Sequence, residues 1–294
     1  MRTNERDRYG TAAEAIRRHY DVSNEFFALW LDPSMTYSCP LWELDDDLEA
    51  GQARKVDHHA IHARAVGAAR VLDIGCGWGG TLHRLVTHHQ VRHAVGLTLS
   101  PAQQTHVRAA GEPRVDVRLE NWQDHRPGAP YDAIVSIEAF EHFAGRAGHR
   151  SARVAGYRHF FATCHQWLAP DGRLSLQTSA RAEDITERRE LAESAFILNT
   201  IFPDTQIPAF DEIVEAGDPY FHLVAHRADP DQYARACAAW LDRLRRHRAA
   251  AADLVGERTV NHYERYLAIC TEHFTAGYLT LLRLTFQRRR TVRG

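Results

Sequence analysis

From residue 70 onward, short apolar runs alternate with longer segments in which apolar residues recur every three or four positions. The short runs predict strands, and the periodic segments predict helices. Strands are expected at residues 70–75, 93–99, 114–119, 131–137 and 173–179, and helices at residues 79–89, 101–110 and 157–168. Such alternation favours a parallel sheet with helices on both faces. Ligands of these sheets bind at the carboxyl ends of the strands.

Helical patterns dominate the chain after this region. Residues 183–218 are expected to be helical with one break, and long helices are expected at residues 230–252 and 257–273. Two further apolar runs, at residues 220–225 and 278–286, predict strands. These helices exceed what a minimal sheet requires, so they predict a cover that excludes water from a reacting centre.

The segment before the sheet is rich in aromatic residues. Residues 11–31 are expected to be helical with an interruption at residues 21–24, where Ser23 or Asn24 could cap a second helix. Another helix is expected at residues 49–66. We interpret this N-terminal segment as a flap over a pocket.

Residues 71–80 are the most informative stretch, because an apolar run turns there into a helical pattern through a cluster of glycines. Gly75, Gly77 and Gly80 have the spacing G-x-G-x-x-G. Glycines let the backbone of such a turn approach a ligand without a Cβ in the way. The spacing is short and therefore also fits a simple tight turn.

A dinucleotide site would need an acidic residue roughly 20 positions after the glycines, to hold the ribose. The second predicted strand instead continues as residues 94–100, which contain no carboxylate. Asp73, which precedes the first glycine, suits a ligand with an ammonium or sulfonium charge. The loop therefore favours S-adenosylmethionine over NAD.

Composition sets the broad class of protein. A chain of 294 residues with 44% hydrophobic content can bury one elaborated domain, or a domain and a lid. The longest apolar runs are shorter than the roughly 20 residues of a membrane-spanning helix, and the charged N-terminus has no apolar signal core. The five cysteines lack zinc-finger or redox spacing, so we expect free thiols in a reducing, cytoplasmic setting.

Charge and histidine spacing point to no further ligand. The net charge of −2 gives no general attraction for nucleic acid or an anionic membrane. The basic residues 288–290 and Arg293 are expected to form a solvated tail. His58 and His62 have a spacing that could bind metal, but no third ligand is evident, so we expect a solvated helix face and no metal.

Acid–base chemistry is suggested at the end of the fourth predicted strand. Glu138, Glu141 and His142 follow this strand, beside the candidate cofactor loop. Two carboxylates and an imidazole in this position form a candidate acid–base cluster. A capped helix start, with Glu141 near the positive helix end, is the alternative that the residues leave open.

Five ordered motifs extend the pattern over the chain, at residues 19–27, 31–39, 72–79, 96–100 and 140–143. Together they resemble the cyclopropane fatty acid and mycolic acid synthase family of S-adenosylmethionine-dependent methyltransferases, and segments within residues 196–203 and 263–274 extend the similarity. The resemblance implies a Rossmann-like class I methyltransferase fold. We expect a mostly parallel seven-stranded sheet with helices on both faces and an added helical lid.

The resemblance implies a cofactor site for S-adenosyl-L-methionine. Tyr37 and Ser38 match family positions that close over the methionine part of the cofactor. Thr98, Leu99 and Gln103 match the segment at the ribose and adenosine. Trp122 and Gln123 match the pair that flanks the adenine. With the residues of the glycine loop, the expected cofactor-binding set is Tyr37, Ser38, Asp73, Gly75, Gly77, Thr98, Leu99, Gln103, Trp122, Gln123 and Ile137.

The resemblance also implies a catalytic set with two departures. In the lipid enzymes of the family a bicarbonate ion, thought to serve as the base, is held by side chains and backbone groups, and Cys39, Glu141 and Tyr233 match three of those positions. Gln177 stands where those enzymes have histidine, and it cannot become a cation. Glu138 stands where they have glycine. The expected catalytic residues are Glu141, His142, Glu138, Tyr233, Gln177 and Cys39.

Glu138 with the Glu141-His142 pair is similar to the plant alkaloid N-methyltransferases of the same superfamily, in which these residues line an amine pocket. The two departures together favour a compact, partly polar acceptor. We therefore expect methyl transfer to an electron-rich carbon of a small natural product, either an alkene or an aromatic ring such as indole. The alternatives are N-methylation of a small amine, cyclopropanation of an unsaturated acyl chain, and a sensor or scaffold that binds the cofactor without catalysis.

These interpretations divide the chain into an N-terminal helical flap (1–66), a cofactor-binding core (67–182), a substrate-covering helical region with one core strand (183–275), and a final core strand with a basic tail (276–294). We expect a small-molecule substrate, no nucleic-acid partner and no stable membrane insertion. A homodimer is left open.

Overall fold

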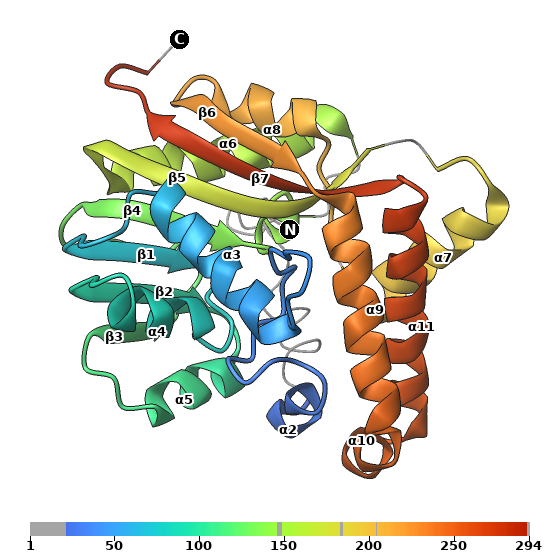
Figure 1. The fold of residues 1–294 in the computed structure, drawn as a ribbon. Coiled ribbons are helices and arrows are strands. Elements are labelled where there is room, and N and C mark those ends of the chain that lie inside the picture. Colours follow the sequence, from blue (N-terminus) through green and yellow to red (C-terminus); the bar gives the residue numbers. More distant parts are fainter. Residues whose placement is uncertain (1–21, 146–148, 183–184, 204, 293–294) are drawn as a thin grey trace, which may run out of the picture.

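The computed structural model describes residues 22–145, 149–182, 185–203 and 205–292. Its centre is one seven-stranded sheet in the order β3-β2-β1-β4-β5-β7-β6 (Figure 1). The strands are β1 (Arg70–Ile74), β2 (His93–Thr98), β3 (Val115–Leu119), β4 (Tyr131–Ile137), β5 (Leu168–Arg181), β6 (Phe221–Ala228) and β7 (Leu279–Arg288). Only β7 runs antiparallel to its neighbours in the sheet, so the mostly parallel seven-stranded sheet is confirmed.

The helices cover both faces of the sheet and the end at which its parallel strands finish (Figure 1). They are α2 (Asn24–Ala28), α3 (Leu48–His62), α4 (Gly80–Thr87), α5 (Pro101–Ala109), the 3-10 helix η2 (Phe140–His142), α6 (Arg150–Trp167), α7 (Arg188–Thr200), α8 (Phe210–Gly217), α9 (Pro230–Arg246), α10 (Arg248–Val255) and α11 (Glu257–Thr275).

Several helix predictions were wrong in their bounds, and two of them have a local explanation. The helix predicted at residues 157–168 begins earlier, at Arg150, because its first turns carry arginines and small residues that hide the apolar period. The helix predicted at residues 230–252 is two helices, because the backbone of His247 leaves the helical region, with φ −107° and ψ 19°. The polar and alanine-rich sequence around this corner continues a helical pattern and gives no sign of the turn.

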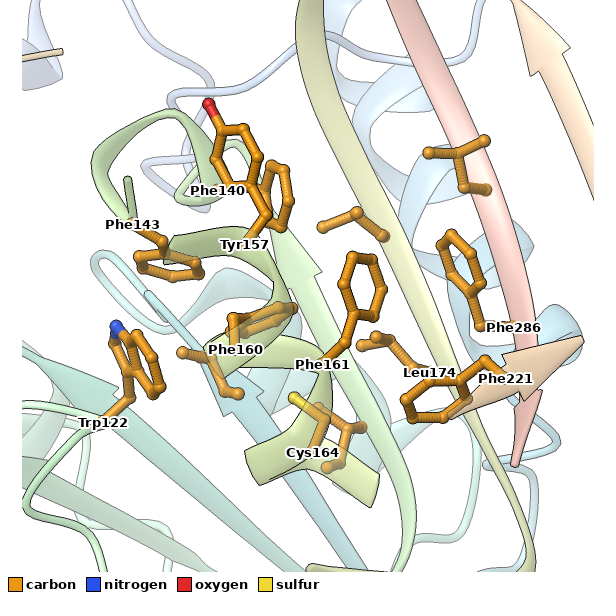
Figure 2. Close-up of a cluster of buried hydrophobic side chains, with 14 of the residues drawn as sticks. Trp122, Phe140, Phe143, Tyr157, Phe160, Phe161, Cys164, Leu174, Phe221 and Phe286 are labelled. Atoms are coloured by element: carbon orange, nitrogen blue, oxygen red, sulfur yellow. The ribbon is translucent and has the colours of Figure 1, made fainter. Parts of the chain in front are cut away.

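Each face of the sheet has its own apolar core. On β1, Leu72 and Ile74 pack into one core, whereas Val71 packs into the other, as the alternation of side chains along a strand requires. Figure 2 shows the first core, where rings of α6 lie against residues of η2, β5 and β7. The rings of Phe140 and Tyr157 stack with centroids 4.4 Å apart. This packing holds η2 at the end of β4.

A third apolar core joins the N-terminal segment to α9 and α11, beyond the end of the sheet. The ring of Tyr37 lies 5.1 Å from that of Trp30 and 5.4 Å from that of Trp240, measured between centroids. The predicted cap of the second helix is confirmed, because the Ser23 hydroxyl accepts a hydrogen bond from the Phe26 backbone N–H. The earlier part of the predicted helix lies outside the described residues, and the proposed division into four regions stays a prediction.

The prediction of a solvated basic tail was wrong for Arg289, which is buried. Its guanidinium forms an ion pair with Asp218 at 2.8 Å and donates to the Phe221 backbone oxygen at 3.0 Å. The reason is that β7 extends further than predicted, so its end pairs with the segment leading into β6. Of the basic residues 288–290, only Arg290 is exposed, and Arg293 lies outside the described residues.

The prediction of a solvated histidine face was also wrong. The rings of His58 and His62 lie 4.1 Å apart between centroids, and both side chains are partly buried. Burial lowers the pKa of His58 to about 4 and also lowers the pKa of His62, so neutral pH favours the uncharged form of both rings. In the part of the chain that the structure describes, no cluster of metal-binding side chains occurs. Within the same residues, no helix has the length and apolar character to cross a membrane.

Candidate active site

A cavity of about 910 Å³ lies at the carboxyl ends of β1, β2 and β4. The expected cofactor residues that line it are Tyr37, Ser38, Asp73, Gly75, Gly77, Thr98, Leu99, Gln103, Trp122 and Ile137. Gln123 does not line the cavity. Its backbone N–H donates to the Asn121 side chain within the turn that follows β3, so its neighbour Trp122 alone reaches the wall.

The glycine loop is shaped by a close approach and by left-handed backbone. Gly75 has a φ of +88°, and a Cβ there would lie 2.4 Å from the Cβ of Ala139. Gly77 has a φ of +52° and faces open space, with no atom within 4 Å of a Cβ placed there. The first glycine therefore lets the loop pack against η2, and the second leaves room for a ligand.

Asp73 supplies an unmatched acceptor to this cavity. The side chain is buried, and its Oδ1 has no hydrogen-bond partner among the described residues. Burial raises the pKa of Asp73 to about 7, and the nearby Lys55 opposes this shift. A buried carboxylate without a partner is costly, so a cationic ligand group in the cavity would stabilise it. The ammonium group of S-adenosylmethionine fits this position.

Glu120 was missed among the cofactor-cavity residues. It follows β3 and lines the cavity. The sequence was searched for such a carboxylate after the second strand, β2, which has none. The place of Glu120 after the third predicted strand was the available signal, because all parallel strands end at the same edge of the sheet. The other residues of the wall that were not predicted are Met35, Thr36, Ile74, Cys76, Trp78, Gly80, Thr81, Leu97, Ala139 and Phe143.

A second cavity of about 920 Å³ lies beside the first and is mainly apolar. Besides residues shared with the first cavity, its wall consists of Glu141, Ser179, Ser194, Ile197, Leu198, Phe202, Thr205, Ile207, Tyr233, Cys237, Tyr266, Cys270, His273, Phe274 and Leu279. Most of these come from α7, α9 and α11, which were predicted as a cover, and of their residues Tyr233 had been predicted to be catalytic. Tyr37, Glu138 and His142 line both cavities, so the two spaces meet at these side chains.

Glu138 is held between the cavities by three donors. Its Oε1 accepts hydrogen bonds from the Cys39 backbone N–H at 2.8 Å and the Gln177 amide at 2.7 Å. Its Oε2 accepts a short hydrogen bond from the Tyr233 hydroxyl. Burial raises the pKa of Glu138, and these three hydrogen bonds oppose the shift. Cys39 and Gln177 line neither cavity, so the structure places them behind Glu138.

Glu141 and His142 lie on η2 and differ from Glu138 in their surroundings. The Oε1 of Glu141 accepts from the Ser179 backbone N–H at 2.6 Å, and its Oε2 has no partner among the described residues. Burial, with the charge of Glu138 as the second cause, raises the pKa of Glu141 to about 8. Burial lowers the pKa of His142 to about 4, and its Nδ1 lies 3.2 Å from the Thr205 hydroxyl.

Buried cations behind the site were missed by the sequence interpretation. Arg283 of β7 forms an ion pair with Asp229 and donates to the Gln177 amide oxygen at 2.9 Å. Lys55 of α3 donates to the Ser38 hydroxyl at 2.7 Å, and burial lowers its pKa to about 8. An arginine inside the apolar run of residues 278–286 was the available signal, because buried charges need partners.

The family model for mycolic acid cyclopropane synthetase matches residues 7–284. The chain belongs to this family. Cyclopropane mycolic acid synthase 2 of Mycobacterium bovis is 35% identical over 288 residues, which cover 92% of this chain and 93% of the relative. The predicted family is thus confirmed.

Solved structures agree with this assignment. A structure of the mycolic acid cyclopropane synthase CmaA1 complexed with SAH and CTAB superposes with a TM-score of 0.86 at 31% identity, covering 95% of this chain and 99% of that chain. Coclaurine N-methyltransferase, bound to N-methylheliamine and SAH, superposes with a TM-score of 0.78 at 18% identity, covering 95% of this chain and 83% of that chain. The second likeness shows the fold alone.

The protein is therefore an S-adenosylmethionine-dependent methyltransferase with a Rossmann-like class I fold, and its cofactor is S-adenosyl-L-methionine. The expectation of C-methylation of a small natural product finds less support than its alternative, because the similar curated relatives are cyclopropane mycolic acid synthases. The residues that bind cofactor and acceptor stay predictions.

Proposed function

We propose that this methyltransferase adds a methyl-derived carbon to the double bond of an unsaturated acyl chain and closes a cyclopropane ring. One observation carries the proposal: an apolar cavity meets the cofactor cavity at Glu138 and His142, in a chain 35% identical to a cyclopropane mycolic acid synthase. An apolar wall suits an alkyl chain, and the shared side chains mark where an acceptor carbon would meet the methyl donor.

The cofactor supplies an activated methyl group on a sulfonium, and the protein supplies position and a dry environment. Placing donor and acceptor in neighbouring cavities provides orientation, which contributes on the order of 7–11 kcal/mol to such reactions. The apolar core that includes Trp30, Trp240 and Tyr263 covers the end of the sheet. It excludes water that would otherwise compete for a reactive cation.

Aromatic side chains line the acceptor cavity where positive charge would develop. Tyr37, Tyr233, Tyr266 and Phe274 belong to its wall, and the hydroxyl of Tyr37 donates to that of Tyr266 at 3.1 Å. The face of an aromatic ring attracts a cation, and the effect grows in a site without water. These rings would stabilise the carbocation that forms on the acceptor.

A second candidate is C-methylation of a compact alkene without ring closure. The polar end of the acceptor cavity favours it, because Glu141, His142 and Thr205 lie there beside Glu138. Such groups suit a small acceptor with polar substituents better than a plain alkyl chain. In this reaction the proton is lost from a carbon next to the cation, and the product keeps the whole methyl group.

A donor that carries a trideuteriomethyl group distinguishes the two candidates. The enzyme is incubated with this donor and with vesicles of phospholipid carrying oleoyl chains, or with an oleoyl thioester. Products with two deuteriums, together with loss of the alkene signal, support cyclopropanation. Products with three deuteriums support methylation without ring closure. Label found only on nitrogen of added amines would overturn both candidates.

A further inference from the structure

The Glu138 carboxylate lies in the wall common to the cofactor and acceptor cavities. Both of its oxygens are engaged by donors, from the Cys39 backbone, the Gln177 amide and the Tyr233 hydroxyl. Donors from three distant segments converge on this one side chain. Hydrogen bonds of this kind stabilise a carboxylate anion more than a neutral acid.

Gln177 is fixed so that it presents a donor to Glu138. Its amide nitrogen donates to the Cys39 backbone oxygen at 3.0 Å as well as to Glu138, and its oxygen accepts from Arg283 Nε at 2.9 Å. His59 Nε2 lies 3.1 Å from the same oxygen and acts as a donor there, since that oxygen only accepts. All four hydrogen-bonding positions of the amide are used. A flipped amide would turn its oxygen toward two acceptors, the Cys39 backbone oxygen and the Glu138 carboxylate.

The backbone of Glu138 is held in an unfavourable conformation. Its φ of +53° lies in the left-handed region, which residues with a Cβ seldom adopt. Its N–H nevertheless donates to the Gln177 backbone oxygen at 2.8 Å, which ties the residue to β5. Strain of this kind in a cavity wall is typical of functional residues. Here it turns the side chain toward the Cys39 and Tyr233 donors.

Glu141 and His142 are the neighbouring titratable groups, and each is placed less well than Glu138 to act as a base. Glu141 lines the acceptor cavity but not the cofactor cavity. His142 lines both cavities, but it has the Thr205 hydroxyl beside its Nδ1 and none of the three donors that hold Glu138. A base for this reaction has to meet the transferred carbon, which would lie where the two cavities join if donor and acceptor occupy them.

We propose that Glu138 is the base of the reaction, a carboxylate built into the chain that makes a bound bicarbonate ion unnecessary. The proposal rests on the proposed function. Transfer of the methyl group to an alkene carbon forms a carbon–carbon bond, breaks the sulfur–carbon bond of the donor and leaves a cation on the neighbouring carbon. Glu138 then takes a proton from the new methyl group, and the electron pair of that C–H bond closes the ring.

The donors that hold Glu138 make the proposal testable by chemical rescue. Glu138→Gly removes the carboxylate, suits the positive φ, and leaves the Cys39 N–H and Tyr233 hydroxyl without their acceptor. We expect this variant to bind S-adenosylmethionine with near wild-type affinity in calorimetry and to have little turnover. Bicarbonate or formate added at millimolar concentration should restore a measurable part of that turnover, because a small anion can fill the vacated place.

Glu138→Gln tests the proton transfer directly, since the amide keeps the shape of the side chain but cannot accept a proton. We expect turnover to fall by roughly 10²–10⁴-fold, with the melting temperature and cofactor affinity little changed. The exposed substitution Glu257→Gln is the matched control and should leave turnover unchanged. Wild-type turnover in buffer freed of carbon dioxide should equal that with added bicarbonate.

The outcomes separate the two proposals. If wild-type enzyme labels no unsaturated acceptor from the deuterated donor, the proposed function fails and the role of Glu138 fails with it. If wild-type enzyme does label an acceptor, then either of two results overturns the role of Glu138 alone. The first is a Glu138→Gln variant that turns over as fast as the wild-type enzyme. The second is a wild-type enzyme that turns over only when bicarbonate is added.

Discussion

The carboxylate of Glu138 accepts a hydrogen bond from the backbone N–H of Cys39, 99 positions earlier in the chain. Glu138 follows β4, whereas Cys39 belongs to the irregular segment between α2 and α3. The contact therefore joins the N-terminal segment to the sheet at the point where the two cavities meet. The chemistry proposed for the site depends on this junction.

The pH dependence of stability tests the environment of Glu141. Its pKa of about 8 in the folded chain exceeds the usual value of 4.5, so the folded state binds more protons than the unfolded state between these values. Its contribution to stability is therefore full at low pH and is lost as the pH rises toward 8. The slope approaches about 1.4 kcal/mol per pH unit for one such group.

Glu141→Gln removes this titration and keeps the side-chain shape. We expect urea unfolding of the variant and the wild type to give similar free energies at pH 5, with the variant the more stable at pH 8. Asp73 titrates in the same direction in both proteins, so the difference between them reports Glu141 together with its coupling to Glu138. A difference that stays constant from pH 5 to pH 8 would contradict the assignment.

Asp73→Asn tests the orphaned carboxylate of the cofactor cavity. Loss of a charge-assisted hydrogen bond to a cationic ligand is worth about 1.5–3 kcal/mol, so we expect S-adenosylmethionine to bind roughly 10- to 100-fold more weakly. The free protein should be no less stable, because the substitution removes a buried, unpaired carboxylate. Calorimetry measures the binding, and the exposed substitution Asp242→Asn serves as the control.

Gly75→Ala tests the close approach of the glycine loop to η2. The new Cβ would meet Ala139 at 2.4 Å, and the residue has a φ of +88°. Gly111 also has a positive φ, of +65°, but no atom lies near a Cβ placed there. We expect Gly111→Ala to cost about 1–2 kcal/mol through backbone strain alone. Gly75→Ala should cost more in thermal unfolding, and equal losses would show that the contact with Ala139 is unimportant.

Arg283→Met tests the buried ion pair behind Gln177. The substitution removes the buried cation from Asp229 and leaves it with Arg227, whose side chain is 46% exposed, as its other ion-pair partner. Removal of one member of a buried pair costs about 3–5 kcal/mol, and the contact with Arg227 reduces this cost. Replacing both residues, as Arg283→Met with Asp229→Leu, should recover much of this loss in denaturant unfolding. The double variant should still turn over more slowly, because Gln177 has lost the donor that orients its amide. Full activity in the double variant would show that Arg283 serves stability alone.

The order of strands and helices could be predicted from the sequence because it depends on local patterns. Apolar runs and helical periods each extend over a few residues, and the predicted strand at residues 131–137 coincides with β4. The predictions failed where distant contacts decide the outcome. The burial of Arg289 depends on Asp218, a residue that it meets only in the folded chain.

The candidate site divides in the same way. Its cofactor half gathers at the carboxyl ends of β1 to β4, and the rule that parallel strands finish at one edge of the sheet lets the sequence predict most of it. Its acceptor half draws on η2, α7, α9 and α11, and sequence order says nothing about which of their faces meet. Glu138 and Gln177 could be singled out as departures from the family pattern, but their hydrogen bond to each other could not.

The sequence by itself indicated the class of enzyme and its cofactor, because five short, ordered motifs, the glycine turn beside Asp73 among them, resemble one methyltransferase family, and each motif is local in the chain. Only the tertiary structure decided which carboxylate reaches both cavities. That choice depends on the register between β4 and β5 and on where the Cys39 and Tyr233 segments pack against them. Contacts across such distances arise from the packing of the whole chain, which no local pattern records.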